Sequence, residues 1–123
     1  MNRITSIAVW ILQFLLTALF AVQGGLKLSG SPAWVSRFEA WGYPDRFYYL
    51  IGAVEVAGAI ALLVPRTARL GAVLLMLVMA GAAGTHAMHR EPQLVTAVVL
   101  LCLLMLTAYM RRRRRTADAP LAH

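Results

Sequence analysis

Residues 52 to 59 read GAVEVAGA and place a single carboxylate, Glu55, in the middle of an apolar run. The small residues Gly52, Gly58 and Ala59 lie three or four positions away, so on a helix they share the face of the carboxylate. Small residues let two helix backbones approach closely, and a buried carboxylate needs a partner. The stretch therefore predicts a helix whose Glu55 side points into a packed helical bundle.

The rest of the chain has the composition of a membrane protein. It has 123 residues, of which 60% are hydrophobic and 14% are charged, outside the usual range of soluble domains. Four apolar blocks, each long enough to cross a hydrocarbon core of about 30 Å, cover roughly residues 5–28, 47–64, 68–88 and 93–110. We therefore expect one all-α domain over residues 1–123, an antiparallel transmembrane four-helix bundle with short turns.

The first block also fits the start of a secretory signal peptide, because a basic residue precedes the apolar run. The run is long and no A-x-A cleavage pattern closes it, which favours a retained helix. The single cysteine, Cys102, excludes an intramolecular disulfide and is expected to pack as a small apolar residue.

The charges predict the orientation of the helices. Five of the twelve Lys and Arg residues stand at positions 111–115, directly after the last apolar block. Under the positive-inside rule this basic tail, residues 111–123, is cytoplasmic, and with four spans the N-terminus is cytoplasmic too. The arginines are expected to attract anionic lipid headgroups rather than nucleic acid, because no stacking aromatics accompany them. Residues 116–123 are expected to be a disordered end.

Seven of the eleven aromatic residues fall between positions 34 and 49, a band typical of a membrane interface. Overlapping the start of this band, a short interfacial helix is predicted over residues 32–41, between the first and second spans, with Ser31 as N-cap and Gly42 as a stop signal. Trp34, Phe38 and Trp41 share one face of that helix. They are interpreted either as an aromatic anchor or as a lid over the mouth of the bundle.

A candidate ligand pocket is predicted at the outer end of the bundle. Gln23 and Lys27 lie near the outer end of the first span, and Glu55 and His86 lie in the outer halves of the second and third. Because Gln23 lies between Lys27 and Glu55 in depth, we expect a hydrogen-bonded network rather than a direct ion pair. Two interpretations stay open: a structural knot that fixes helix register, or a site for proton handling or headgroup binding.

Three further patterns give weaker expectations. In the third span, Gly71, Ala80 and Gly84 predict a smooth face that meets another helix. No second polar cluster is expected at the inner end. His86 and His89 are weak candidates for metal ligands, but two imidazoles three residues apart do not predict a metal site.

Three stretches resemble the DoxX-like family of small four-helix bacterial membrane proteins: GGLKLSG (24–30), WGYPDRFYYLIGAVEVAGAIALLVP (41–65) and MAGAAGTHAMH (79–89). The resemblance implies a multi-pass protein of the bacterial inner (cell) membrane and an association with quinone-linked redox systems. Lys27 and Glu55 match recurring polar positions of the family. The resemblance carries over no catalytic residue, and the expectation leans against a catalytic activity of the protein's own.

The leading functional hypothesis is an accessory membrane subunit whose outer pocket helps to hold a quinone headgroup or to dock a redox protein partner. Quinone is the one candidate cofactor, and a homo-oligomer remains open. The alternative is a non-catalytic structural or chaperone-like membrane module that has no small ligand. A small transporter is less favoured, because four spans leave little room for a path.

Overall fold

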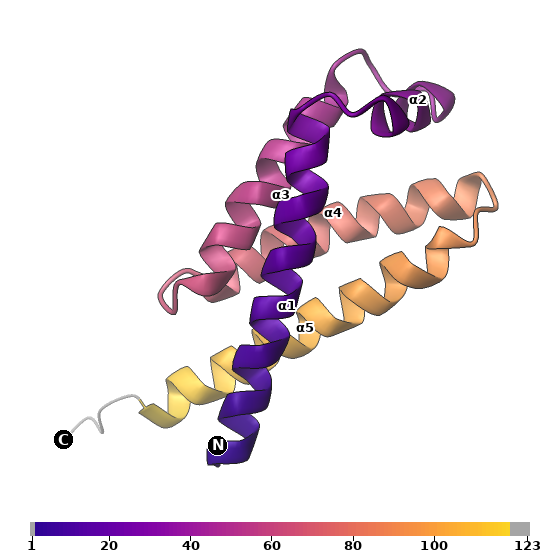
Figure 1. The fold of residues 1–123 in the computed structure, drawn as a ribbon. Coiled ribbons are helices and arrows are strands. Elements are labelled where there is room, and N and C mark those ends of the chain that lie inside the picture. Colours follow the sequence, from indigo (N-terminus) through magenta and orange to yellow (C-terminus); the bar gives the residue numbers. More distant parts are fainter. Residues whose placement is uncertain (1, 119–123) are drawn as a thin grey trace.

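The computed structural model describes the backbone of residues 2–118 and the side chains of residues 2–111. This part of the chain forms five helices and no strand, which confirms the all-α prediction. The helices are α1 (Arg3–Leu28), α2 (Pro32–Ala40), α3 (Phe47–Leu63), α4 (Ala68–Met88) and α5 (Gln93–Asp118) (Figure 1).

The predicted blocks agree with these helices to within about two residues at all but one end. The exception is the last block, because α5 continues through the arginine run to Asp118. Of the predicted disordered end, residues 116–118 are helical, and residues 119–123 lie outside the described part of the chain.

Three helices are long and apolar enough to cross a membrane: α1, α4 and the Gln93–Arg111 part of α5. Helix α3 is apolar but has only 17 residues, or roughly 25 Å at about 1.5 Å per residue. Three of the four predicted spans are thus long and apolar enough to cross a membrane, and α3 falls short in length. Large side chains such as Phe14 and Leu77, which are 65% and 66% exposed, cover the outside, as is expected of helices that face lipid.

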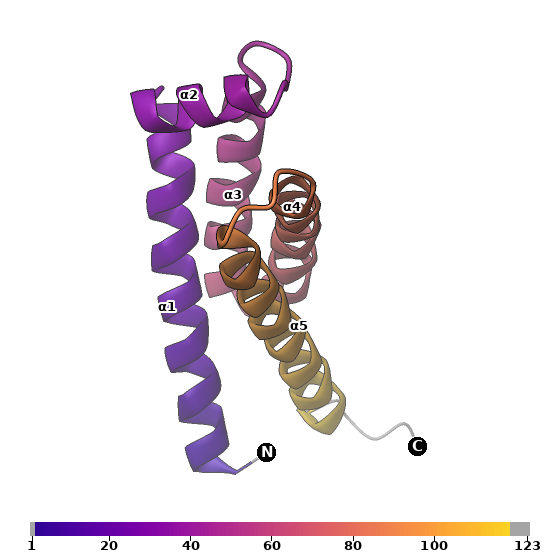
Figure 2. The same ribbon diagram turned by 90° about the vertical axis from the view of Figure 1, so that its right-hand side faces the viewer.

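The helices pack in chain order. Helix α1 packs along α3, α3 against α4 and α4 along α5, whereas α1 meets α5 over a much shorter stretch. Figures 1 and 2 show the α4–α5 pair inclined steeply to the α1–α3 pair, where a regular bundle had been expected. Helix α2 lies across one end of the α1–α3 pair, and the first residues of α1 and the last residues of α5 lie toward the opposite end.

Helix α3 packs closely against both α1 and α4, at one pair of glycines in each contact. A Cβ atom on Gly24 of α1 would lie 2.8 Å from the carbonyl oxygen of Gly52, and one on Gly71 of α4 would lie 2.7 Å from that of Gly58. Backbones therefore touch at both crossings, with no room for a side chain. The predicted inward face of α3 is confirmed, because Gly52, Glu55, Gly58 and Ala59 are all buried.

The smooth face predicted on α4 is wrong for two of its three residues. Gly71 is buried against α3, but Ala80 and Gly84 are exposed, and a Cβ atom on Gly84 would meet nothing within 4 Å. The reason is that α3 and α5 pack against other faces of α4. The core consists of buried apolar residues from α1, α3, α4 and α5, namely Leu16, Phe20, Ala59, Leu62, Ala72, Leu75, Met79 and Leu104.

Candidate functional site

Lys27 and Glu55 form a direct ion pair in the interior. The Lys27 Nζ atom donates a hydrogen bond to Glu55 Oε1, and the two side chains are only 7% and 1% exposed. The predicted network is therefore wrong. Contact between Gly24 and Gly52 brings the two backbones so close that the lysine side chain spans the depth difference by itself.

Helix α2 covers this pair through Trp34. The Lys27 ammonium lies 4.0 Å from the centre of the Trp34 ring, and the Arg37 guanidinium lies 4.9 Å from the same ring. Both distances are within the range of cation–π attraction. Lys27 is thus held by a carboxylate of α3 and by an aromatic face of α2.

The other two predicted pocket residues do not bond to this pair. Gln23 Oε1 is buried and has no hydrogen-bond partner within the described residues. His86 turns toward the α4–α5 turn, where its Nδ1 atom lies 3.0 Å from Glu91 Oε1. Lys27 and Glu55 therefore contact each other directly, Gln23 lies one turn before Lys27, and His86 is bound to Glu91.

All four residues nevertheless line one cavity of about 370 Å³, to which all five helices contribute. This volume lies within the usual range for small-molecule sites. Most of the lining is apolar or aromatic, and it includes the three residues of the predicted lid, Trp34, Phe38 and Trp41. The cavity is therefore mainly an apolar space with a few polar groups in its wall, unlike the polar pocket that was expected.

Phe38 anchors the aromatic band at this end. It is 5% exposed, and its ring centre lies 5.4 to 6.3 Å from those of five other aromatic residues, namely Trp34, Trp41, Tyr43, Phe47 and Tyr48. Ser31 stands at the N-cap as predicted but makes no side-chain cap hydrogen bond. Gly42 follows the helix with a φ of +81°, a left-handed conformation that favours glycine.

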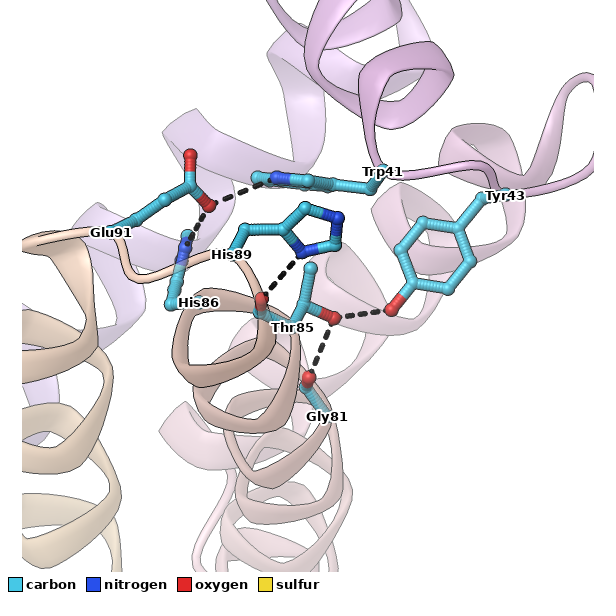
Figure 3. Close-up of polar contacts among 7 residues, drawn as sticks. All are labelled: Trp41, Tyr43, Gly81, Thr85, His86, His89 and Glu91. Atoms are coloured by element: carbon cyan, nitrogen blue, oxygen red, sulfur yellow. Dashed lines mark hydrogen bonds and ion pairs between the residues drawn. The ribbon is translucent and has the colours of Figure 1, made fainter.

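Trp41, His86 and Glu91 form a contact that we term the outer clasp (Figure 3). Glu91 Oε1 accepts hydrogen bonds from Trp41 Nε1 at 2.9 Å and from His86 Nδ1 at 3.0 Å. Beside it, the hydroxyl groups of Tyr43 and Thr85 are hydrogen-bonded. The clasp ties the segment after α2 to the turn between α4 and α5.

The hydrogen bond from His86, followed by that from Trp41, holds the pKa of Glu91 below its ordinary value, although partial desolvation opposes the shift. The carboxylate of the outer clasp is therefore favoured in its ionised form.

The two weak metal candidates have their Nδ1 atoms engaged in hydrogen bonds. His89 Nδ1 donates to the carbonyl oxygen of Thr85 at 2.9 Å, and His86 is bound to Glu91 (Figure 3). In the part of the chain that the structure describes, no three His, Cys, Asp or Glu side chains are grouped to share a metal ion.

A second polar cluster, which the sequence interpretation missed, joins the other ends of the helices. Gln13 is fully buried, donates from Nε2 to the Leu62 carbonyl oxygen at 2.7 Å and accepts at Oε1 from Arg111 Nε. The Arg111 guanidinium also lies 4.3 Å from the centre of the Trp10 ring. We term these four residues the inner cluster.

The spacing of the buried residues along α5 indicates that Arg111 belongs to the inner cluster. Arg111 continues, at intervals of three and four, the stripe that includes the buried residues Leu104 and Thr107. Arg111 is only 7% exposed, so this first arginine of the run belongs to the packed helices and not to the solvated tail.

Three long apolar helices and a buried Lys27–Glu55 ion pair indicate a small multi-pass membrane protein. The chain belongs to the DoxX-like family, whose model matches residues 11–108. It is 33% identical over 94 residues to the uncharacterized protein YdgD of Bacillus subtilis (strain 168). The aligned region covers 72% of this chain and 82% of that protein. No solved structure matches the chain.

Proposed function

We propose that the protein is an accessory membrane subunit of a quinone-linked redox system and that its cavity receives the quinone headgroup. The observation that carries the proposal is a buried Lys27–Glu55 ion pair in the wall of a mainly apolar cavity. A quinone ring is flat and apolar, with carbonyl oxygens that accept hydrogen bonds. Such a carbonyl would accept from Lys27, and Glu55 would handle the proton.

We also propose how the protein is oriented in the membrane. It lies in the bacterial inner membrane, with α3 as a fourth, short span and with both termini cytoplasmic. Support comes from the arginines, because Arg3, Arg66, Arg69 and the run at 111–115 outnumber the cations elsewhere in the chain. The end that bears α2 would then face outward and meet a redox protein or a second copy.

One observation favours a second candidate function, a structural or chaperone-like module without a small ligand. Lys27 and Glu55 satisfy each other directly, and Trp34 covers the lysine. A self-contained pair of this kind fixes the register of two helices without any ligand. On this alternative, Glu55→Gln lowers stability and changes no redox property of the membrane.

Two matched variants of α4 separate these candidates. Cβ atoms on Gly81 and Gly84 would both meet nothing within 4 Å, but only Gly81 lines the cavity. Gly81→Leu should therefore fill the cavity, whereas Gly84→Leu should leave it open. Lys27→Ala removes the proposed donor.

The measurement is the thermal unfolding of each purified protein in detergent, with and without ubiquinone-1. A ligand at about 100 times its dissociation constant stabilises the folded state by about 2.7 kcal/mol. The proposal predicts a clear upward shift for the wild type and Gly84→Leu, and a lost or reduced shift for Gly81→Leu and Lys27→Ala. No shift in the wild type, or equal shifts in all four proteins, would refute quinone binding.

A further inference from the structure

Contacts between neighbouring helices close most sides of the cavity. Between α1 and α3 the backbones touch at Gly24 and Gly52. Helices α4 and α5 pack along each other and are joined by a short turn. On the side between α3 and α4, the hydrogen bond between Tyr43 and Thr85 ties the segment before α3 to α4 (Figure 3). Helix α2 lies across the end of the α1–α3 pair.

The side between α1 and α5 is covered least. These two helices contact each other over a much shorter stretch than α1 and α3 do. The hydrogen bond from Arg111 Nε to Gln13 Oε1 joins them in the inner cluster, away from α2. Figure 1 shows that α1 and α5 cross and then diverge toward the start of α5.

Residues that line the cavity on this side are also exposed at the surface. Leu19 of α1 lines the cavity and is 36% exposed, and Thr96 of α5 lines it and is exposed as well. Their neighbours Phe20 and Ala97, which line the cavity from further inside, are only 1% and 4% exposed. The cavity thus reaches the lipid-facing surface between α1 and α5. We term the rim formed by Leu19, Thr96 and Leu100 the lateral opening.

We infer that the quinone enters from the bilayer through the lateral opening and that its prenyl chain lies in this opening while the headgroup is bound. The inference rests on the proposed function. A cavity of about 370 Å³ has room for the ring but not for a long prenyl chain as well. The chain is apolar, so it is favoured in lipid rather than in water. The route past α2 leads instead toward the membrane surface, and the outer clasp holds it closed.

The first test locates the chain by photo-cross-linking of the wild type in detergent. The probe is a decylubiquinone analogue that carries a diazirine on the last carbon of its chain, and peptide mass spectrometry finds the labelled residues. We expect labels beside the lateral opening, at Leu15, Leu19, Thr96 or Val99, and excess ubiquinone-1 should remove them. Leu77 of α4 also lines the cavity and is 66% exposed. Competed labels mainly at Leu77, or spread evenly over all helices, would overturn the inference.

The second test narrows the lateral opening with Leu19→Trp. Its control is Val22→Trp, at a position of the same helix that is 60% exposed and lies outside the cavity lining. Isothermal titration calorimetry measures the dissociation constants of decylubiquinone and ubiquinone-1. In Leu19→Trp, decylubiquinone should lose at least about tenfold more affinity than ubiquinone-1, roughly the effect of two methylene groups displaced from an apolar contact. Val22→Trp should bind both molecules like the wild type.

The outcomes separate the inference from the proposed function. If Leu19→Trp weakens both molecules equally or neither of them, the inference is overturned, while binding of ubiquinone-1 to the wild type keeps the proposed function. If the wild type binds neither molecule, both fail together. The cross-linking test needs no variant, so it stands even if Leu19→Trp does not fold.

Discussion

Replacing Gly24 with alanine tests the backbone contact that brings Lys27 to Glu55. The new Cβ atom would lie 2.8 Å from the Gly52 carbonyl oxygen and 2.8 Å from Val56 Cγ2, where ordinary contact begins at 3.4 Å. Helices α1 and α3 would have to separate by roughly half an ångström or more. Overpacking of this kind typically costs about 1–3 kcal/mol of unfolding free energy.

The adjacent Gly25 supplies the control, because a Cβ atom there would meet nothing within 4 Å. Both substitutions gain the same helix propensity, about 0.8–1.0 kcal/mol. The difference between the two variants therefore isolates the packing term, and Gly24→Ala should be about 1–3 kcal/mol less stable than Gly25→Ala.

Reversible denaturation in detergent micelles, followed by far-ultraviolet circular dichroism, measures this difference. If the two alanine variants agree to within about 0.5 kcal/mol, roughly the spread seen for ordinary surface substitutions, α1 and α3 do not touch at these glycines. The explanation given for the direct ion pair would then be wrong.

Three further predictions use the same unfolding measurements. Lys27→Met should destabilise the protein by about 3–5 kcal/mol, because it leaves a buried carboxylate alone, and adding Glu55→Leu should recover most of that loss. Arg111→Ala should lower the free energy of unfolding by about 1–3 kcal/mol, because it removes the donor to Gln13 Oε1. If the effects of Arg111→Ala and Gln13→Leu are additive, the two side chains are not coupled and the inner cluster is contradicted. Because the folded-state pKa of Glu91 is depressed, its stabilising contribution is present above the ordinary value of 4.5 and is lost as the pH falls through the lower folded-state value. Below pH 4.5 the unfolding temperature of the wild type should fall faster with decreasing pH than that of Glu91→Gln. If the unfolding temperatures of the two proteins fall in parallel, the outer clasp is excluded.

Local features of the sequence were sufficient to predict the helices. The block at residues 68–88 coincides with α4, because a proline turn precedes it and polar residues follow it. Glu55 was correctly predicted to face inward from the spacing of Gly52 and Gly58, which is a property of one helix. Helix α5 runs past the predicted end of the last span, which agrees with the apolar part Gln93–Arg111, because charge marks a membrane boundary but does not stop a helix.

Contacts between distant segments were not predictable in this way. The Gln13–Arg111 hydrogen bond joins residues 98 positions apart and depends on how the α4–α5 pair leans across α1. The direct Lys27–Glu55 pair depends on the separation of two helix axes, which hydropathy does not report. His86 was expected in the pocket, but its Nδ1 atom is bound to Glu91 in the turn that follows its own helix.

The central claim is that the cavity holds a quinone-type molecule, and identifying the lipophilic molecules that co-purify with the protein in mild detergent tests it most directly. Mass spectrometry of the wild type and of Gly84→Leu should find a prenylquinone near one equivalent per chain. The same analysis of Gly81→Leu should find little or none. Absence of prenylquinone from the wild type, or equal amounts in all three proteins, would contradict the claim.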